Sequence, residues 1–370
     1  MDALILSCGT GGGHNAAAKA IMEELIGRGW NAELLNPYTL CGTNTAEIID
    51  EIYIRLVQRF AKGFGFIYQL GELYRRFPFR SPIYFINGKA AKYLGKYLES
   101  KRFDVIIATH LFPAEMITWL KNSGIYIPPI IYVATDFTCI PFTEDTECDA
   151  YIIPAKEIKE EFVRRGIPAD RIYPLGIPVR ASFRKPITCL EAKTALGLEK
   201  DKDYLLLSGG SMGAGKLLSI VKKLRAQYGN EHLIVICGSN EALFRKLHRK
   251  YGNDIILLHS TEKMAEYIRA SKAFFTKPGG LSSTEAAVIG TVLVHLPPIP
   301  GCETKNVRFF SQSGMSYYLN SFQKGITQAL FLANDAEARA NMIQSQSRII
   351  HKNASAEICD LAQNMVYDVS

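Results

Sequence analysis

The sequence has no run of about 18 uninterrupted apolar residues, which is the length that a helix needs to cross a bilayer. Any contact with a membrane is therefore expected to be peripheral. The chain runs from Met1 almost directly into an apolar segment at 3–8, without a basic region or a cleavage site. This absence predicts that the protein is not secreted.

Closely spaced metal ligands are missing as well. The eight cysteines lie far apart, with no Cys-x-x-Cys pair and no paired histidine spacing, so the pattern does not predict a zinc site. We expect the cysteines to be thiols in a reducing cytosol, and we expect no bound metal.

The chain does contain enough apolar residues for two domains. Domains usually run to about 100–200 residues, and this chain has 370, of which 48% are hydrophobic and 21% charged. Its formal net charge of +7 favours an anionic partner, which could be a nucleic acid, a nucleotide or a membrane surface. Charge alone does not choose among these partners.

Short apolar runs alternate with helical patterns along the chain, and the alternation restarts after 176–180. The predicted strands lie at 3–8, 31–36, 103–108, 130–134 and 150–153, and then at 203–208, 232–237, 254–258, 273–275 and 291–295. The helical patterns between them include 155–165 and a helix near 189–196. This alternation predicts an α/β fold with parallel sheets that helices cover on both faces. We expect a first domain at 1–180, a second at 181–345 and a C-terminal helix at 346–370 that packs back on the first domain.

The segment 52–99 mixes aromatic side chains with lysines and arginines. Basic heads and aromatic bodies suit a membrane interface. Helices with buried aromatics and solvated cations would have the same composition, so both interpretations stay open. We expect this segment to form the membrane or acceptor region of the first domain.

The first motif that can carry chemistry is Ser7-Cys8-Gly9-Thr10-Gly11-Gly12-Gly13-His14, between a predicted strand and a predicted helix. Glycines let the backbone approach a ligand, and a helix N-terminus offers amides to an anion. A dinucleotide site would need glycine where His14 stands and an acid where Asn36 stands, so redox chemistry is disfavoured. His14 could accept a proton from an attacking hydroxyl, or it could cap its own helix.

The second motif, Gly210-Ser211-Met212-Gly213-Ala214-Gly215-Lys216-Leu217, follows a predicted strand and differs from a P-loop by one residue. Leu217 stands where a P-loop has the Ser or Thr that holds magnesium, and the next strand ends without an acid for the metal. The motif favours phosphate or ribose binding over phosphotransfer. A tight turn without a ligand is the alternative.

The third motif is Thr276-Lys277-Pro278-Gly279-Gly280-Leu281-Ser282-Ser283-Thr284-Glu285. Ser282, Ser283 and the amides near them can hold a diphosphate, and Glu285 can accept hydrogen bonds from ribose hydroxyls. Ser283 and Glu285 could also simply cap the helix. Beyond the next strand, Glu303 and Asn306 are candidates to bind sugar hydroxyls.

In this order the motifs resemble those of the monogalactosyldiacylglycerol synthase and processive diacylglycerol glucosyltransferase family, which is related to the bacterial N-acetylglucosaminyltransferase that makes lipid II. The likeness covers most of the chain. It comprises Gly11-Gly12-Gly13-His14, Thr109-His110, Thr135-Asp136-Phe137, Gly176-Ile177-Pro178-Val179, Gly209-Gly210-Ser211-Met212-Gly213, Cys237-Gly238-Ser239-Asn240, Thr276-Lys277-Pro278-Gly279-Gly280 and Pro300-Gly301-x-Glu303-x-x-Asn306.

The resemblance implies a GT-B fold of two facing Rossmann-like domains, with a UDP-sugar on the C-terminal one and a lipid acceptor entering the N-terminal one. It implies inverting transfer of a hexose from UDP-glucose or UDP-galactose to diacylglycerol or a related membrane glycolipid, without a metal, another cofactor or nucleic acid. The expected location is cytoplasmic, in peripheral contact with the anionic inner face of the cell membrane. An isoprenoid-linked acceptor and a P-loop-like phosphotransferase remain the alternatives.

The resemblance also assigns residues. The candidates for catalysis are His14, Asp136 and His110, and the base stays open between His14, Asp136 and an acid in 52–99. The residues expected to bind the donor are Gly13, Gly210, Ser211, Met212, Gly238, Asn240, Met264, Lys277, Pro278, Gly279, Gly280, Ser282, Ser283, Glu285, Glu303 and Asn306. Relatives usually have Gln where Cys302 stands, so the choice between glucose and galactose stays open.

Overall fold

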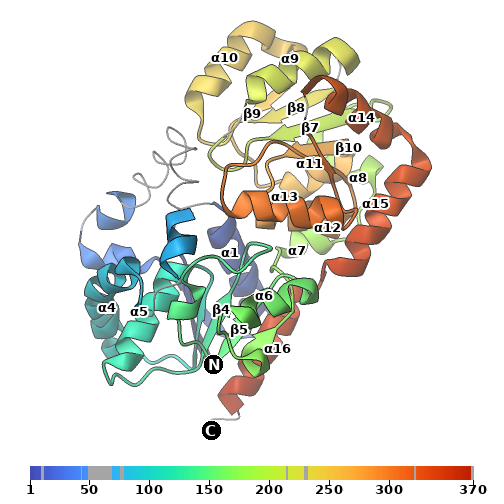
Figure 1. Cartoon of the computed structure of the whole chain (residues 1–370). Helices are drawn as coiled ribbons and strands as arrows, with labels where there is room; N and C mark the ends of the chain where they lie inside the picture. Colours follow the sequence, from blue (N-terminus) through green and yellow to red (C-terminus); the bar gives the residue numbers. More distant parts are fainter. Residues whose placement is uncertain are drawn as a thin grey trace. The chain divides into compact units, whose positions relative to one another are not determined.

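The chain forms two compact units in a computed structural model that describes residues 1–9, 12–42, 44–48, 69–75, 79–213, 216–228, 232–320 and 322–367 (Figure 1). The first unit contains Met1–Ala181, Ile299–Cys302 and His351–Ser370, and the second contains Ser182–Pro298 and Glu303–Ile350. Of the predicted membrane or acceptor segment 52–99, residues 52–68 and 76–78 lie outside the described residues.

The first unit is built on a six-stranded parallel sheet. Its strands lie in the order β2 (Asn31–Leu35), β1 (Asp2–Leu6), β3 (Val105–Ala108), β4 (Ile130–Val133), β5 (Ala150–Ile152) and β6 (Ile172–Tyr173). Its helices include α1 (Gly12–Gly27), α4 (Pro82–Ser100), α5 (Leu111–Asn122), α6 (Lys159–Arg164) and α16 (Ala354–Tyr367), with 3-10 turns η1 (Pro37–Cys41), η2 (Thr143–Asp145), η3 (Lys156–Ile158) and η4 (Ala169–Arg171). Every residue of β3, β4 and β5 is buried, as expected for parallel strands covered on both faces.

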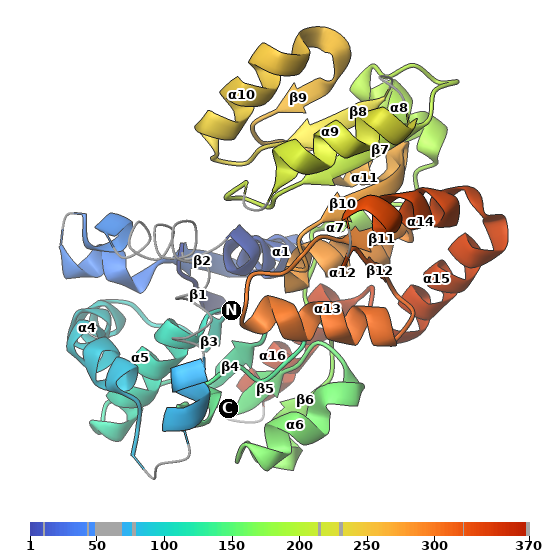
Figure 2. The same cartoon turned by 45° about the horizontal axis from the view of Figure 1, so that its top comes forward.

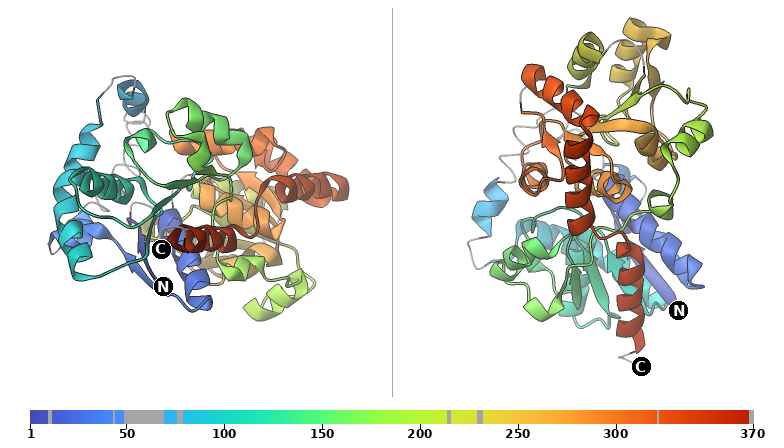
Figure 3. Two further views of the ribbon diagram at one scale, coloured as in Figure 1. Left: turned by 90° about the horizontal axis from the view of Figure 1, so that it is seen from below. Right: turned by 90° about the vertical axis from the view of Figure 1, so that its right-hand side faces the viewer.

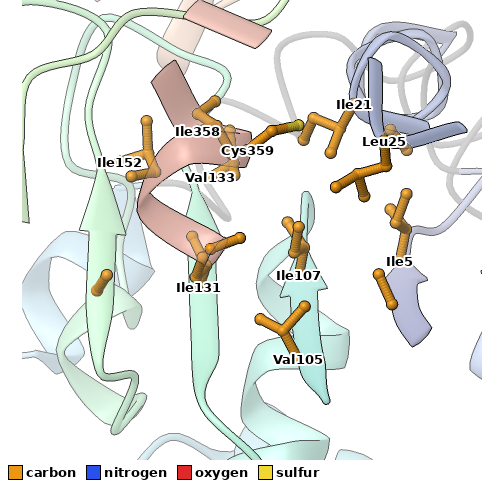
Figure 4. Packing of buried hydrophobic residues seen from close by; sticks show 14 of the residues in the cluster. Ile5, Ile21, Leu25, Val105, Ile107, Ile131, Val133, Ile152, Ile358 and Cys359 are labelled. Carbon is orange, nitrogen blue, oxygen red and sulfur yellow. The ribbon is translucent and has the colours of Figure 1, made fainter. Parts of the chain in front are cut away.

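An apolar core joins the two ends of the chain within this unit. Ile21 of α1 and Ile358 of α16 belong to the same buried cluster as Ile107 and Ile131 of the sheet (Figure 4). Helix α16, dark red in Figure 3, packs directly on α1. The last helix is therefore part of this unit's core. Burying one such side chain contributes about 1.5–3 kcal/mol to stability.

The second unit has its own six-stranded parallel sheet. Its strands lie in the order β12 (Tyr317–Tyr318), β11 (Val292–His295), β10 (Ser271–Thr276), β7 (Tyr204–Ser208), β8 (Leu233–Ile236) and β9 (Ile256–Leu258). The helices are α7 (Ala181–Arg184) at the junction with the first unit, α8 (Cys189–Leu196), α9 (Leu217–Tyr228), α10 (Glu241–Tyr251), α11 (Met264–Ala270), α12 (Gly280–Ile289), α13 (Cys302–Gln312), α14 (Phe322–Asn334) and α15 (Ala336–Ile349), with η5 (Gly252–Asp254). Helices α9 and α14 pack together, while α11 and α12 both pack on β10 (Figure 2).

The strand order reverses in each sheet, and this reversal positions the loops that matter. In the first unit the chain goes from β1 to β2 on one side and then to β3 on the other. In the second unit β8 and β10 flank β7 in the same way. The last paired residues there are Leu6 with Ala108, and Ser208 with Thr276. Open α/β sheets bind ligands at the carboxyl ends of the strands at such a reversal.

None of the helices in the described ranges is both long enough and apolar enough to cross a bilayer.

Candidate active site

In the second unit, the loop after β7 lies directly against the loop after β8. Gly213 and Gly238 have φ angles of +57° and +58°, and a Cβ at Gly213 would lie only 1.8 Å from the carbonyl oxygen of Cys237. Ser239 N donates a hydrogen bond to the carbonyl oxygen of Ser211 (2.8 Å). The glycines of the sequence motif are therefore required for this contact between loops.

The side-chain amide of Asn240 links the loop 210–213 to the start of α10. Its Nδ2 donates to the carbonyl oxygen of Gly213 (3.0 Å), and its Oδ1 accepts from the backbone N of Leu243 (2.9 Å), which caps α10. Both ends of the amide are thus used within the unit. Asn240 supports the loop 210–213, although the sequence assigned it to the donor.

The loop after β10 contacts the loop 210–213 through the side chain of Lys277. A Cβ at Gly210 would lie 2.6 Å from Cε of Lys277, so the lysine stem crosses the glycine. Its Nζ forms an ion pair with Oε1 of Glu303 at 3.0 Å, with side chains only 17% and 10% exposed. Nδ2 of the buried Asn306 donates to the carbonyl oxygen of Pro278 (3.0 Å). The N-terminal part of α13 therefore supports the loop 277–280 through Glu303 and Asn306.

Helix α12 begins at this loop with open backbone amides. Its N-cap is Gly279, which offers no side-chain cap, and the first turn of α12 contains no acid. The first amides of a helix lack intrahelical partners and attract anions. Ser282 and Glu285 follow in the helix and are both half-buried.

The sequence left Ser283 open between diphosphate binding and a role within the helix, and its side chain lies inside the unit. Its hydroxyl is fully buried and lies 2.7 Å from the carbonyl oxygen of Gly279 and 2.9 Å from Nε2 of His295. Burial lowers the pKa of His295 to about 3, so that ring is neutral. Ser283 therefore stabilises the start of α12 from inside instead of presenting its hydroxyl to a ligand.

Of the two methionines expected at the donor, Met212 lies in the loop 210–213 and Met264 lies outside the three loops. Met212 is buried within the loop 210–213, and the half-buried Met264 begins α11, which packs on β7 and β10. The described contacts do not give Met264 a partner in the three loops.

The P-loop-like features of the second motif are only partly present in the structure. Residues 214 and 215 lie outside the described residues, Lys216 is exposed, and Leu217 is a fully buried residue at the start of α9. The position that holds magnesium in a P-loop is therefore occupied by an apolar core side chain.

In the first unit, His14 lies at the carboxyl ends of three strands. It is the third residue of α1, and its Nδ1 is 2.8 Å from the carbonyl oxygen of Thr109 and 2.9 Å from Oγ1 of Thr135. A carbonyl oxygen can only accept, so Nδ1 carries the proton and Nε2 of the neutral ring keeps its lone pair. The contacts of His14 thus reach the neighbouring strand ends, and the ring is set up to accept a proton at Nε2.

The electrostatics of the site keep His14 neutral. Burial lowers the pKa of His14, while the Asp136 carboxylate and the hydrogen bond to Thr109 oppose this effect. Asp136 itself is half-buried and directly follows Thr135. Gly13 is half-buried beside His14 in the first turn of α1, and Gly11 lies outside the described residues.

His110 has a structural task at this site. It is the N-cap of α5, and its Nδ1 accepts a hydrogen bond from the backbone N of Phe112 (3.1 Å). Its ring packs edge-on against His14, with centroids 4.5 Å apart. Burial, and then the neighbouring His14, holds the pKa of His110 well below its ordinary value. His110 therefore positions His14 and is a poor proton acceptor.

Thr109 and Thr135 are the partners that sequence reasoning did not assign. Oγ1 of Thr109 donates to the backbone carbonyl of His14 (3.1 Å), so Thr109 holds this histidine at both its backbone and its ring. Their positions in the sequence could have indicated this role, because each threonine follows a buried parallel strand within one or two residues.

Within the part of the chain that the structure describes, no three His, Cys, Asp or Glu side chains gather as a metal site would require.

With this geometry established, comparison with known proteins places the chain. Residues 14–179 match the family model of monogalactosyldiacylglycerol (MGDG) synthase, and residues 204–356 match that of the glycosyltransferase family 28 C-terminal domain. The chain belongs to the glycosyltransferase family that these two models describe. The two matched regions carry the His14 site and the glycine loops, respectively.

Curated relatives match this chain in sequence over nearly its whole length. It is 28% identical over 377 residues to a processive diacylglycerol beta-glucosyltransferase of Bacillus mycoides, covering 98% of this chain and 93% of the relative. It is 26% identical over 361 residues to the Bacillus subtilis protein of the same name, covering 96% and 92%.

Solved structures show the same GT-B fold. Acinetobacter baumannii MurG matches with a TM-score of 0.61 at 15% identity, covering 98% of this chain and 99% of MurG. Anabaena HepE in complex with UDP and glucose matches with a TM-score of 0.57 at 12% identity, covering 98% and 99%. At these identities the likeness concerns the fold alone.

Proposed function

We propose that this protein is an inverting glycosyltransferase that transfers a hexose from UDP-glucose or UDP-galactose to diacylglycerol or a related membrane glycolipid. The observation that carries the proposal is the meeting of the loops 210–213 and 277–280 at the strand reversal of a family 28 domain. The relatives named as diacylglycerol glucosyltransferases suggest the acceptor class.

The donor binds the second unit in this proposal. The open amides at the start of α12 hold the diphosphate, with Ser282 beside them, and Glu285, one turn further, accepts hydrogen bonds from the ribose. Glu303, in the first turn of α13 at the edge of the same loop, binds the sugar hydroxyls, and the buried Asn306 holds that loop through the carbonyl oxygen of Pro278. Thus one cluster of loops serves the diphosphate, the ribose and the hexose of a UDP-sugar.

The transfer is a single displacement. The acceptor hydroxyl attacks the anomeric carbon, the bond from that carbon to the diphosphate breaks, and its electron pair leaves with UDP. Nε2 of His14 takes the hydroxyl proton, because the Thr109 carbonyl keeps the ring's own proton on Nδ1. Attack opposite the leaving group inverts the anomeric configuration.

In this mechanism the backbone amides at the start of α12 take the place of a metal. UDP gains negative charge as it leaves, and fixed donors already pointing at that charge stabilise the transition state. We therefore propose that the reaction needs no divalent cation, which activity in EDTA would test directly.

A surface of α4 supports a peripheral membrane contact. Phe85 and Ile86 are 59% and 64% exposed, and Lys89, Lys92 and Lys96 are exposed along the same side of the helix. The opposite side packs on α5 so tightly that a Cβ at Gly88 would lie 2.6 Å from Trp119. Apolar side chains flanked by lysines suit an anionic bilayer surface, so we propose that α4 rests on the inner face of the cell membrane.

The test is UDP release from a panel of UDP-sugars with diacylglycerol in mixed micelles containing EDTA. The intact protein is compared with His14→Ala and with His248→Ala, which changes an exposed histidine of α10. We expect acceptor-dependent turnover with one of the hexose donors, its loss in His14→Ala, and wild-type turnover in the control.

Other outcomes would assign another reaction. Turnover only with an isoprenoid-linked lipid would change the acceptor, and activity only after magnesium is restored would contradict the metal-free mechanism. Magnesium-dependent phosphate release from a nucleoside triphosphate would favour the P-loop-like phosphotransferase.

A further inference from the structure

A lysine lies over the glycine loop of the second unit, but it is not the lysine that the loop motif contains. In a P-loop the motif's own lysine reaches the phosphates. Here Lys216 is exposed, and the stem of Lys277 crosses Gly210 from the end of the adjacent strand β10. The parallel pairing of β7 with β10 therefore supplies the cation from a separate segment.

An ion pair with Glu303 holds the side chain of Lys277 in place. Its Nζ and Oε1 of Glu303 are 3.0 Å apart, and both side chains are largely buried. Removing two charges from water is costly unless other interactions compensate for it. An ammonium group has three donor hydrogens, and Glu303 is the one partner of Nζ that the described contacts record. Further hydrogen-bonding capacity is thus present next to the loop.

We propose that Lys277 is the cation that binds the diphosphate of the nucleotide, and that Glu303 holds it above Gly210 until the donor arrives. This rests on the proposed function and specifies how its donor site works. The diphosphate of a UDP-sugar carries two negative charges, whereas the start of a helix supplies only about half a positive charge. Lys277 adds a full positive charge at the same strand reversal.

The role of Lys277 in the reaction follows from this placement. When the bond between the anomeric carbon and the diphosphate breaks, the electron pair and its charge stay on UDP. Lys277 transfers no proton. Its ammonium group stabilises the phosphate oxygens that gain charge, and this interaction strengthens as the bond breaks.

Calorimetric titration of the full chain with UDP and with uridine separates phosphate binding from loop support. Lys277→Met removes the charge and keeps the length of the stem, while Lys277→Arg keeps the charge. The matched control is Lys272→Met, because Lys272 lies on β10, the strand that Lys277 directly follows, and its Nζ pairs with Oδ2 of Asp203 at 2.8 Å. We expect Lys277→Met to weaken UDP binding by about 10–100-fold, as for loss of a charge-assisted hydrogen bond, and uridine binding by less than about threefold.

The remaining results distinguish the possible failures. Lys277→Arg is expected to recover part of the UDP affinity, and Lys272→Met to keep all of it. An equal loss of UDP and uridine binding in Lys277→Met would show that the lysine only supports the loop, and unchanged UDP binding would also overturn the proposal. If the unaltered protein bound neither UDP nor a UDP-sugar, the proposed function itself would fail instead.

Discussion

Replacing Gly213 by alanine tests whether contact between the loops 210–213 and 237–240 forms the phosphate-binding surface. Gly213 has a φ of +57°, and its added Cβ would lie 1.8 Å from the carbonyl oxygen of Cys237. Ordinary contact begins at 3.4 Å, so the two backbones would have to separate by about 1.6 Å. A separation of this size breaks the hydrogen bonds that join the loops.

Gly197 offers a matched control. Its φ is +67° at the C-terminal end of α8, and no atom lies within 4 Å of its Cβ position. Alanine in this left-handed backbone costs about 1–2 kcal/mol at either site. Gly213→Ala also loses the bonds from Asn240 to Gly213 and from Ser239 to Ser211, each worth about 0.5–1.5 kcal/mol. We expect a total loss of about 2–5 kcal/mol for Gly213→Ala and about 1–2 kcal/mol for Gly197→Ala.

The assay is urea unfolding followed by far-ultraviolet circular dichroism, together with titration by UDP. Tryptophan fluorescence would not suffice, because Trp30 and Trp119 both lie in the first unit. UDP affinity should fall in Gly213→Ala and stay unchanged in Gly197→Ala. If the two variants lost the same stability and both kept UDP affinity, the loop contact would have no part in the site.

Three further predictions concern the first unit. His14→Ala should lower kcat by about 10²–10⁴. Because burial lowers the pKa of His14, the acid limb of the kcat/KM profile of the intact protein should lie below pH 6.5, and a limb above 6.5 would contradict a buried base. Burial raises the pKa of Glu115 in α5 from 4.5 to about 8, so the folded state binds more protons than the unfolded state between these values and stability falls as pH rises. Glu115→Gln should therefore stabilise the protein by about 2–4 kcal/mol at pH 8.5 and not at pH 4, as measured by urea midpoints, and an equal effect at both pH values would refute this. Phe85→Ser with Ile86→Ser should weaken co-sedimentation with phosphatidylglycerol vesicles by about tenfold or more, whereas Leu190→Ser, at a 54% exposed position of α8, should not.

Much of the fold was predictable because local patterns carried it. The strands expected at 203–208 and 291–295 correspond to β7 and β11, and the helix expected near 189–196 is α8. That helix begins with a capping box between Thr188 and Glu191 and ends at Gly197, which are signals that a sequence displays directly.

Elements without enough residues for a pattern were missed. β6 and β12 contain two residues each, which is too short for any periodicity. The helix expected at 155–165 consists of two elements in the structure. The 3-10 turn η3 ends at Ile158, and the short helix α6 begins at Lys159. Local sequence predicted helical structure there without distinguishing the two types.

The glycine motifs could be located from sequence, but their partners could not. Lys277 meets Gly210 because β10 pairs with β7, and this pairing depends on the order of strands in the whole sheet. Ser283 follows the diphosphate pattern in sequence, yet its hydroxyl turns inward to His295, which belongs to the next strand. Only tertiary packing decides which polar side chains of such a motif face a ligand.

The contacts of His14 combine two opposed effects that a general base needs. Burial, the larger effect, keeps the ring neutral before the reaction, so that a lone pair is available on Nε2. Asp136 acts in the opposite direction, because its carboxylate favours the charged imidazolium that forms once the proton is taken. A base that was only buried would resist accepting the proton, and one beside an unopposed carboxylate would already carry it at neutral pH. Since the Thr109 carbonyl also fixes which nitrogen accepts, Asp136 is better placed as the partner that stabilises charged His14 than as the base itself.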